Sequence, residues 1–212
     1  MPRIEPFEKY YDQYEDWFVK NKFAFKAEIE AVRKHIPEHS RGIEIGVGSG
    51  LFAEPLGIHI GLEPSREMRT IAVKRGVDVV EGIAEHLPFM DDFYDFALMV
   101  TTICFVDDVQ QSINEARRII KAGAKLIIGL IDKNSPVGKI YRKHQQESVF
   151  YKDASFYSTD EIVGYMKKAG FQNFYFTQTI FTSPDKVGEA EQIKEGFGEG
   201  SFVVISAVNK NG

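Results

Sequence analysis

The sequence predicts a three-layer α/β protein whose central sheet is mostly parallel. Short apolar strands alternate with helical segments over residues 42–131, a glycine-rich turn follows the first of these strands, and the strand at Lys125–Ile131 is apolar almost throughout. Strands that alternate with helices form right-handed βαβ units, and a strand covered on both faces needs few polar residues. Ligands of such sheets bind at the carboxyl ends of the strands.

Composition narrows the class of protein. A chain of 212 residues fits a single domain, which we expect to span 1–212. The net charge of −5 and the absence of a dense basic cluster disfavour nucleic acid as a partner. Cys104 is the one cysteine, so an internal disulfide and a multi-cysteine metal site are excluded and a reducing compartment is favoured. The charged N-terminus is no secretory signal and no apolar run has membrane-spanning length, so we expect a cytoplasmic protein without a membrane partner.

The N-terminal 40 residues are predicted to form two helices that end at Pro37. Aromatic residues recur among charges from Tyr10 to Phe25, followed by apolar residues at near-helical spacing. Core packing is one interpretation of the aromatic residues. The other is a lid over a ligand, because this segment leads directly into the glycine-rich turn.

That turn lies within RGIEIGVGSG, residues 41–50, where Gly46, Gly48 and Gly50 lack the Cβ that would keep a ligand away from the main chain. A phosphate loop would need a Lys directly after the last glycine, and no Lys or Arg follows until Arg66. A dinucleotide site has the spacing Gly-x-Gly-x-x-Gly, whereas this turn has Gly-x-Gly-x-Gly. Glu44, two positions before the turn, would repel a diphosphate and suits a cationic ligand. An ordinary strand-to-helix turn remains the alternative.

Beyond Gly50, Pro55 and Gly57 leave room only for a very short helix. The next strand, IHIGLEPS, ends at Glu63, whose carboxylate is well placed to accept both hydroxyls of a ribose. A solvated glutamate at a strand end is the alternative. Ser65 is the expected N-cap of the following helix, which closes at Gly76.

The remaining elements follow in order. Strands are expected at 77–80, 95–102, 125–131, 171–181 and 201–208, and helices at 109–123, within 133–157 and at 158–170. Asp107 or Asp108 is expected to cap the first of these helices, and Ser158 or Thr159 with Glu161 resembles a capping box. The polar, glycine-studded connection at 182–200 is long enough to be functional or mobile.

Seven segments in order resemble the class I S-adenosylmethionine-dependent methyltransferases, specifically the small-molecule group that includes the ubiquinone and menaquinone biosynthesis enzymes. They are IEIGVGSG, IGLEPSREM, EGIAEHLPF, FYDFALMVTT, INEARRIIKAGAKLII, STDEIVGYMKKAGF and SFVVISAV, and they span 43–208. The resemblance implies a Rossmann-like three-layer sandwich with a seven-stranded, mostly parallel sheet whose last strand is antiparallel. It also implies three parts: an N-terminal helical lid (1–40), a cofactor-binding half (41–131), and an acceptor-side insert with the C-terminal strands (132–212).

The resemblance assigns S-adenosylmethionine as cofactor, with S-adenosylhomocysteine as product. The implied cofactor-binding residues are Glu44 and Gly46 beside the methionine part, Gly48 beneath the ribose region, Glu63 with Pro64 at the ribose hydroxyls, Ala84 and Glu85 at the adenine, and Thr101 at the methionine amino group. A cofactor with a sulfonium, an ammonium and no phosphate suits a turn flanked by carboxylates.

Two features depart from the family pattern. Ile83 stands where the family usually has an Asp that accepts from the adenine amino group, so Glu85 or a backbone carbonyl would have to take its place. The helix after the turn is also cut short at Pro55. These departures motivate the alternative of a non-catalytic protein that binds S-adenosylmethionine or S-adenosylhomocysteine. A nicotinamide-dependent oxidoreductase is disfavoured by the glycine spacing.

The sequence assigns no catalytic acid or base and no metal site. Methyl transfer from a sulfonium is an in-line displacement, and positioning with exclusion of water supplies most of the acceleration. His144 and Asp132 are candidate bases, but an exposed helix histidine is the favoured interpretation of the first, and a helix cap or a solvated strand end that of the second. The acceptor is expected between the N-terminal aromatic residues and the 133–157 insert, whose aromatic residues suggest a small ring-bearing or amine acceptor.

Overall fold

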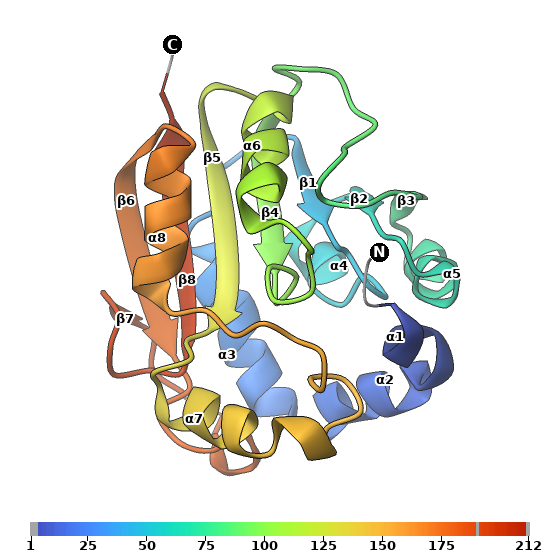
Figure 1. Ribbon diagram of the computed structural model, residues 1–212, viewed down its shortest axis with the longest axis vertical. Helices are drawn as coiled ribbons and strands as arrows, with labels where there is room; N and C mark the ends of the chain where they lie inside the picture. Colours follow the sequence, from blue (N-terminus) through green and yellow to red (C-terminus); the bar gives the residue numbers. More distant parts are fainter. Residues whose placement is uncertain (1–3, 190, 211–212) are drawn as a thin grey trace.

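A single eight-stranded sheet forms the centre of the computed structural model, which describes residues 4–189 and 191–210 (Figure 1). Its strand order is β3-β2-β1-β4-β5-β8-β6-β7. The strands are β1 (Gly42–Ile45), β2 (Ile60–Leu62), β3 (Asp78–Val80), β4 (Tyr94–Val100), β5 (Ile120–Ile131), β6 (Phe171–Thr179), β7 (Lys194–Glu195) and β8 (Phe202–Asn209). Strands β1 to β5 pair in parallel, and β8 runs antiparallel between β5 and β6. The expected mostly parallel sheet with an antiparallel last strand is confirmed; the eighth strand is the two-residue β7.

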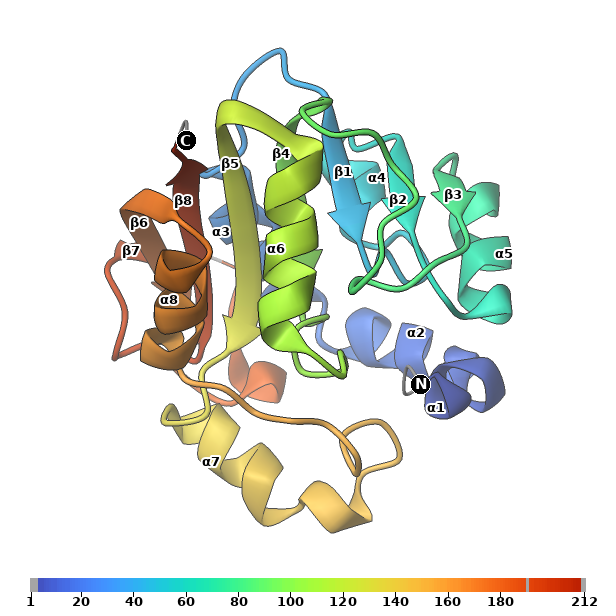
Figure 2. The ribbon, with the colours of Figure 1, turned by 45° about the horizontal axis from the view of Figure 1, so that its top comes forward.

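Helices cover both faces of the sheet and produce the expected three layers (Figure 2). The helices are α1 (Glu5–Lys9), α2 (Tyr11–Lys20), α3 (Lys22–Arg33), α4 (Ala53–Leu56), α5 (Arg66–Lys74), α6 (Val109–Ile119), α7 (Pro136–Lys143) and α8 (Thr159–Lys168), with single 3₁₀ turns at Gln145–Glu147 and Pro184–Lys186. Helices α6 and α8 pack on one face, and α3, α4 and α5 supply the core on the other. Helices α1, α2 and α7 lie beyond the carboxyl ends of the parallel strands.

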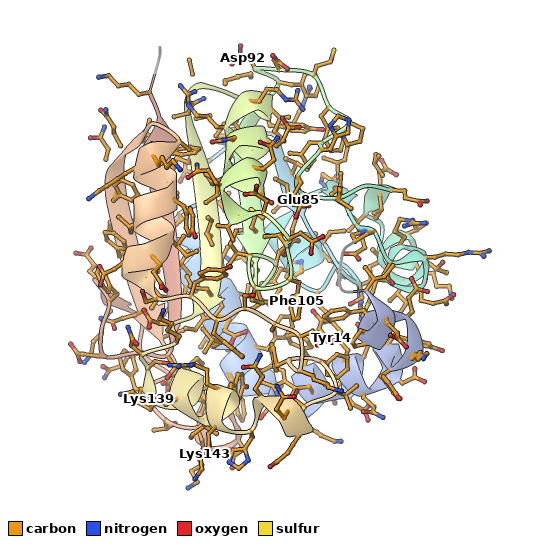
Figure 3. The ribbon with its side chains drawn as sticks, viewed as in Figure 1. Tyr14, Glu85, Asp92, Phe105, Lys139 and Lys143 are labelled. Carbon is orange, nitrogen blue, oxygen red and sulfur yellow. The ribbon has the colours of Figure 1, made fainter. Side chains whose placement is uncertain are left out.

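The insert helix α7 has two different faces. Lys139 and Lys143 point outward, away from the rest of the protein (Figure 3), while Val137 is buried and Tyr141 is turned toward the sheet end. This orientation turns the apolar side of α7 toward the carboxyl ends of the strands.

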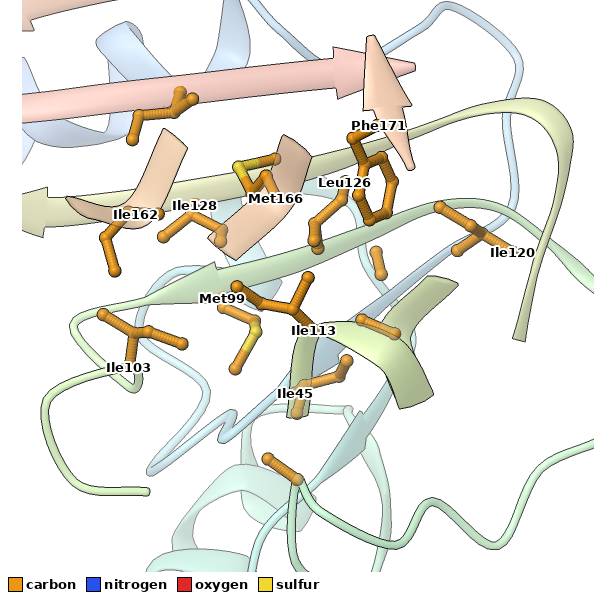
Figure 4. Close-up of a cluster of buried hydrophobic side chains, with 14 of the residues drawn as sticks. Ile45, Met99, Ile103, Ile113, Ile120, Leu126, Ile128, Ile162, Met166 and Phe171 are labelled. Carbon is orange, nitrogen blue, oxygen red and sulfur yellow. The ribbon is translucent and has the colours of Figure 1, made fainter. Parts of the chain in front are cut away.

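Buried apolar side chains hold the carboxyl ends of β1 and β4 in place. Figure 4 shows Ile45, Met99 and Ile128 of the sheet packed against Ile113 of α6 and Met166 of α8, and all five are buried. Interiors of this kind are close-packed, so the ends of β1 and β4 have little freedom to move relative to each other. The turns that follow these strands are therefore held at fixed positions.

The expected helix caps are confirmed. Ser65 Oγ accepts from the Met68 amide, and Asp108 Oδ1 accepts from the Gln111 amide. Ser158 and Glu161 form a complete capping box. Each such cap contributes about 1 kcal/mol. Because a cap depends on residue types within a few positions of the helix start, the sequence alone predicts it.

Two boundaries differ from expectation. The N-terminal segment forms three helices, because the Asn21 side chain donates to Trp17 O at 2.9 Å and satisfies the end of α2 there. Helix α6 ends at Ile119 rather than at Ala122–Gly123, because Ile120 already pairs with Tyr94 of β4. Gly123, at φ +80°, makes a turn inside β5. In the part of the chain that the structure describes, no helix combines the length and apolarity needed to cross a bilayer.

Candidate functional site

A cavity of about 490 Å³ opens between the carboxyl ends of the parallel strands and the helices α1, α2 and α7. This volume falls in the range of small-molecule sites, roughly 300–1,000 Å³. The residues that line it from the sheet side are Gly46, Gly48, Phe52, Leu62, Glu63, Pro64, Met68, Ile83, Ala84, Glu85, Val100, Thr101, Thr102, Phe105, Val106 and Ile131. Seven of the eight cofactor residues expected from the sequence therefore meet at one cavity; Glu44 is the exception.

The glycine turn forms one wall through its backbone. Gly46, Gly48 and Gly50 all have positive φ, at +71°, +54° and +84°, which favours glycine at each position. A Cβ on Gly46 would lie 2.3 Å from Thr102 Cγ2, whereas a Cβ on Gly48 would meet nothing nearer than the Tyr14 hydroxyl at 3.7 Å. The missing side chain of Gly48 thus leaves space in the cavity itself.

Glu63 at the end of β2 is held in position by two backbone amides. Its Oε2 accepts from the Gly48 amide and its Oε1 from the Ser65 amide, both at 2.9 Å. Burial raises the pKa of Glu63 to about 7, against the lowering effect of these two hydrogen bonds. Each carboxylate oxygen retains a further lone pair, so Glu63 can accept two more hydrogen bonds from a ligand.

Glu44 lies behind the glycine turn and does not line the cavity. It is 2% exposed, its Oε2 has no hydrogen-bond partner among the described residues, and the Ala53 amide is its backbone donor. Burial, together with the nearby charge of Glu63, holds the pKa of Glu44 well above its usual range. A buried acid next to an oriented acid favours positive charge in the adjoining space.

The segment expected to face adenine forms another edge of the cavity. Ile83, Ala84 and Glu85 all line it. Ile83 O accepts from the His86 amide, and Glu85 Oε1 accepts from the amides of Asp107 and Asp108. Glu85 Oε2 has no hydrogen-bond partner in the described part of the chain.

Thr101 at the end of β4 has an unusual backbone conformation. Its φ is +50°, which is costly for a β-branched residue, about 1–3 kcal/mol. Its amide donates to Gly129 O at 2.8 Å and its carbonyl accepts from Cys104 Sγ. Strain of this kind gathers at binding sites, and here it turns the main chain at the cavity wall.

The opposite half of the cavity is aromatic. Phe7, Tyr14, Trp17 and Phe18 line it from the N-terminal helices, and Tyr141, Phe150 and Tyr151 line it from the insert. Phe7 contacts Phe105, Phe150 and Tyr14 edge to face or tilted, with centroids 5.1–5.7 Å apart. Figure 3 places Glu85, Phe105 and Tyr14 in sequence from the sheet end toward α2. The N-terminal aromatic residues are therefore both packed together and part of the cavity wall.

Glu28 is a cavity residue that sequence reasoning missed. It lies on α3 among small buried residues, is only 6% exposed, and has no hydrogen bond or ion pair with any described residue. Burial raises its pKa to about 8. Its spacing with Ala24, Ala27 and Ala31 places it on the buried face of the helix, which was the one signal available in the sequence.

The two candidate bases, His144 and Asp132, lie outside the cavity wall. His144 is exposed and contacts Glu147, and Asp132 holds the start of α8 by accepting from the amide and hydroxyl of Thr159 at 2.8 and 2.7 Å. Neither lines the cavity. Within 4–189 and 191–210, no group of three or more potential metal ligands is arranged to hold an ion.

Helices α1 and α2 are fastened to the binding wall by ion pairs and hydrogen bonds. Glu15 of α2 accepts from the Ser49 hydroxyl of the glycine turn and pairs with Arg75, the residue that follows α5. Glu8 of α1 accepts from the Arg66 amide at 2.6 Å, at the start of α5. These contacts connect helix α2 directly to the glycine turn and helix α1 to the start of α5.

A glycine turn after β1, an oriented acid after β2 and this strand order define an α/β protein of the nucleoside-binding methyltransferase class. A family model described as a methyltransferase domain matches residues 43–128. A solved S-adenosylmethionine-dependent methyltransferase from Thermotoga maritima, described as a possible histamine N-methyltransferase, is 51% identical, with a TM-score of 0.94 over 97% of this chain and 98% of that one. The chain belongs to the family of S-adenosylmethionine-dependent methyltransferases.

Two further proteins are similar to this chain. An uncharacterized protein of Methanocaldococcus jannaschii is 49% identical over 95% of this chain and 97% of its own length. A demethylmenaquinone methyltransferase of Thermobifida fusca is 37% identical over 32% of this chain and 28% of its own. The cavity suits the methyl donor: Gly48 leaves room against the main chain, Glu63 has acceptor capacity to spare, and Glu44 is a buried acid without a cation.

Proposed function

We propose that this protein moves a methyl group from S-adenosylmethionine to a nitrogen or oxygen of a small, ring-bearing or amine acceptor. The observation that carries the proposal is the continuity of one cavity, whose sheet half has the glycine turn and Glu63 and whose other half is aromatic. Donor and acceptor would meet in one enclosed space. We further propose a cytoplasmic protein without a nucleic-acid partner, in keeping with its negative net charge.

For the sheet half, we propose that the residues expected from the sequence hold the cofactor. Gly46 and Gly48 would offer bare main chain, Glu63 beside Pro64 would accept the ribose hydroxyls, and Thr101 would present its backbone to the amino group. Ala84 and Glu85 would receive adenine, with Glu85 Oε2 as the acceptor in place of the absent Asp. Glu44 would lie behind the turn near the methionine part, where a bound cation would favour its ionised form.

The chemistry requires little from side chains. S-adenosylmethionine supplies a methyl group already activated on a sulfonium. The residues of this chain bind and orient the two reactants, and the helices α1 and α2 of the proposed lid exclude water. An acceptor nitrogen must be unprotonated when it attacks, and the described cavity wall has no histidine.

An amine acceptor has independent support. The Thermotoga maritima protein at 51% identity is described as a possible histamine N-methyltransferase. Aromatic faces such as those of Trp17 and Tyr141 attract organic cations. These two facts favour nitrogen over oxygen as the attacked atom.

Calorimetry combined with a transfer assay tests the proposal. We expect binding of S-adenosylmethionine and S-adenosylhomocysteine but not of NAD, and transfer of radiolabelled methyl to at least one amine in an acceptor panel. Binding of NAD alone would refute the proposal. Binding of S-adenosylhomocysteine with no turnover over a broad panel would support the non-catalytic alternative that Ile83 motivates.

The ribose role of Glu63 has its own prediction. Glu63→Ala removes an acceptor of two ligand hydrogen bonds, so the affinity for S-adenosylhomocysteine should fall roughly 10–100-fold, since hydrogen bonds to charged groups contribute about 1.5–3 kcal/mol each. Titration calorimetry measures it, with the exposed Glu67→Ala on α5 as the control. Unchanged affinity in Glu63→Ala would overturn the assignment.

A further inference from the structure

Glu28 stands apart from the cofactor half of the cavity. It comes from α3 and lines the cavity together with three tyrosines of other elements: Tyr14 of α2, Tyr141 of α7 and Tyr151 of the loop after α7. Burial raises the pKa of each phenol, and the negative charge of Glu28 adds to this effect, most clearly at Tyr141, where Glu28 is the acid that contributes among the described residues. Glu28 is therefore the buried acid of the aromatic half, as Glu63 is the buried acid of the sheet half.

A buried carboxyl without a partner is costly, and nothing in the fold requires one at this position. No described residue donates a hydrogen bond to Glu28, and its helical neighbours Ala24, Ala27 and Ala31 are apolar. Carboxyls in such surroundings normally pair with a cation or an N–H donor. The cavity is the space from which that partner can reach Glu28.

The charge balance of the wall favours one sign of ligand. Among the residues that the structure describes, four acidic side chains line the cavity, Asp16, Glu28, Glu63 and Glu85, against a single basic one, Lys20. Lys20 is 75% exposed and its nearest acid is Asp16, at 3.7 Å on the same helix. An anionic acceptor would find no buried cation to bind it.

We propose that Glu28 is the acceptor-binding carboxylate and that it selects acceptors with a basic nitrogen, an amine or an imidazole, carried on a ring or a short chain. The proposal rests on the proposed function and narrows its acceptor class. The protonated nitrogen binds between the carboxylate of Glu28 and the aromatic faces around it, where an organic cation gains from both. If this nitrogen is the one methylated, it first gives its proton to the Glu28 carboxylate, which frees the lone pair for attack. Neutral alcohols lack the charge, and carboxylates and phosphates are repelled.

The other titratable groups around Glu28 do not compete with it near neutral pH. Burial raises the pKa of Tyr141 to about 12 and also raises the pKa values of Tyr14 and Tyr151, so all three phenols remain neutral. Lys20 and Asp16 are mostly exposed. Burial raises the pKa of Glu28 to about 8, so a cation that binds its carboxylate displaces a proton below that pH.

Three probes with one ring and one chain test the proposal: phenethylamine, 2-phenylethanol and phenylacetate. Each is titrated into the full-length protein by calorimetry, with and without saturating S-adenosylhomocysteine. We expect the amine to bind at least about tenfold more tightly than the alcohol, and phenylacetate not to bind measurably. Histamine, as an imidazole probe, should follow the amine.

Glu28→Gln keeps the size of the side chain and removes its charge. We expect it to weaken amine binding by about tenfold or more, and to leave the affinities for 2-phenylethanol and S-adenosylhomocysteine within about twofold. Glu28→Asp should retain the preference for the amine. Glu30→Gln, an exposed carboxylate two positions away on the same helix, is the matched control and should bind like the wild type.

The pH dependence adds a readout that a structural role would not move. Amine affinity of the wild type should rise about tenfold per pH unit below pH 8 and level off above it, and Glu28→Gln should abolish this slope. Equal binding of the three probes, or an unchanged amine affinity and slope in Glu28→Gln, would overturn the inference. Failure of the wild type to bind S-adenosylhomocysteine would instead overturn the proposed function, and the titrations without it would still decide the role of Glu28.

Discussion

Gly48 affects both the backbone conformation of the turn and the space inside the cavity. Its positive φ is shared with Gly57, which lies at the end of α4 at φ +70°. A Cβ at Gly57 would meet no atom within 4 Å, whereas a Cβ at Gly48 would project toward the Tyr14 hydroxyl inside the cavity. Both glycines therefore adopt a positive φ, but only Gly48 borders the cavity.

This pair yields a matched prediction. Gly48→Ala and Gly57→Ala should each cost about 1 kcal/mol of stability through strain at positive φ. Only Gly48→Ala should also weaken S-adenosylhomocysteine binding, by about tenfold or more, because its methyl group occupies ligand space. Thermal denaturation and calorimetry on both variants provide the comparison, and equal affinities would show that the ligand does not lie on this turn.

Glu28 lowers the stability of the free protein, because its carboxyl is buried without a hydrogen-bond partner among the described residues. Its folded-state pKa of about 8 lies above the ordinary 4.5. The unfolded chain loses this proton above pH 4.5 while the folded chain keeps it, so the associated stability is present below pH 4.5 and is lost as pH rises to about 8.

Glu28→Gln removes this dependence. The variant should gain stability over the wild type between pH 5 and pH 8, by roughly 2–4 kcal/mol. Denaturant unfolding at the two pH values measures the gain, and the exposed Glu30→Gln should show none. A constant difference between variant and wild type at both pH values would contradict the burial of this carboxyl in solution.

At the scale of elements, α1 and α2 differ from the helices of the sandwich. Neither contains a buried residue, whereas α3 contains six and α6 five. Helices that bury little apolar surface open at low free-energy cost. The contact of Glu15 with Ser49 and Arg75 therefore contributes a large share of what holds α2 over the cavity.

Glu15→Gln should loosen this cover. The half-buried pair with Arg75 contributes on the order of 1 kcal/mol, so amides of α2 should exchange about fivefold faster and S-adenosylhomocysteine should dissociate faster by a similar factor. Hydrogen exchange and stopped-flow measurements test both, with the exposed Asp12→Asn on the same helix as the control. Unaltered exchange in α2 would show that the aromatic contacts alone keep the helix closed.

The whole molecule behaves as two packed cores that share one sheet, with the site at an end that both cores support. A ligand that contacts the glycine turn, the ends of β2 and β4, and α2 adds contacts between elements that are distant in the sequence. Binding should therefore stabilise the entire fold rather than one loop.

Saturation with S-adenosylhomocysteine should raise the melting temperature accordingly. At a ligand concentration one hundred times the dissociation constant, the gain of about 2.7 kcal/mol corresponds to roughly 5–10 °C for a chain of this size. Differential scanning calorimetry measures the shift, and NAD should produce none. The absence of a shift with S-adenosylhomocysteine would contradict cofactor binding at this cavity.

Much of this architecture could be predicted from the sequence because its signals are local. The caps at Ser65, Asp108 and Ser158, the short helix before Gly57, and the apolar β5 depend on neighbouring residues along the chain. Local signals did not predict the features that depend on pairing with another strand. The end of α6 depends on pairing with β4, and β7 exists only because β6 lies beside it.

The α/β class, the mostly parallel sheet and the residues of the glycine turn could be predicted from the chain alone, because periodicity and glycine spacing are local properties of a sequence. The tertiary structure was needed to show that Glu28 lines the cavity while Glu44, 16 positions later, does not. Both are buried glutamates among apolar neighbours, Glu44 on β1 and Glu28 on α3, and their local spacing predicts burial without telling which one borders the cavity. The difference arises because Tyr14 of α2 and Tyr141 of α7, distant in sequence, form the cavity wall together with Glu28.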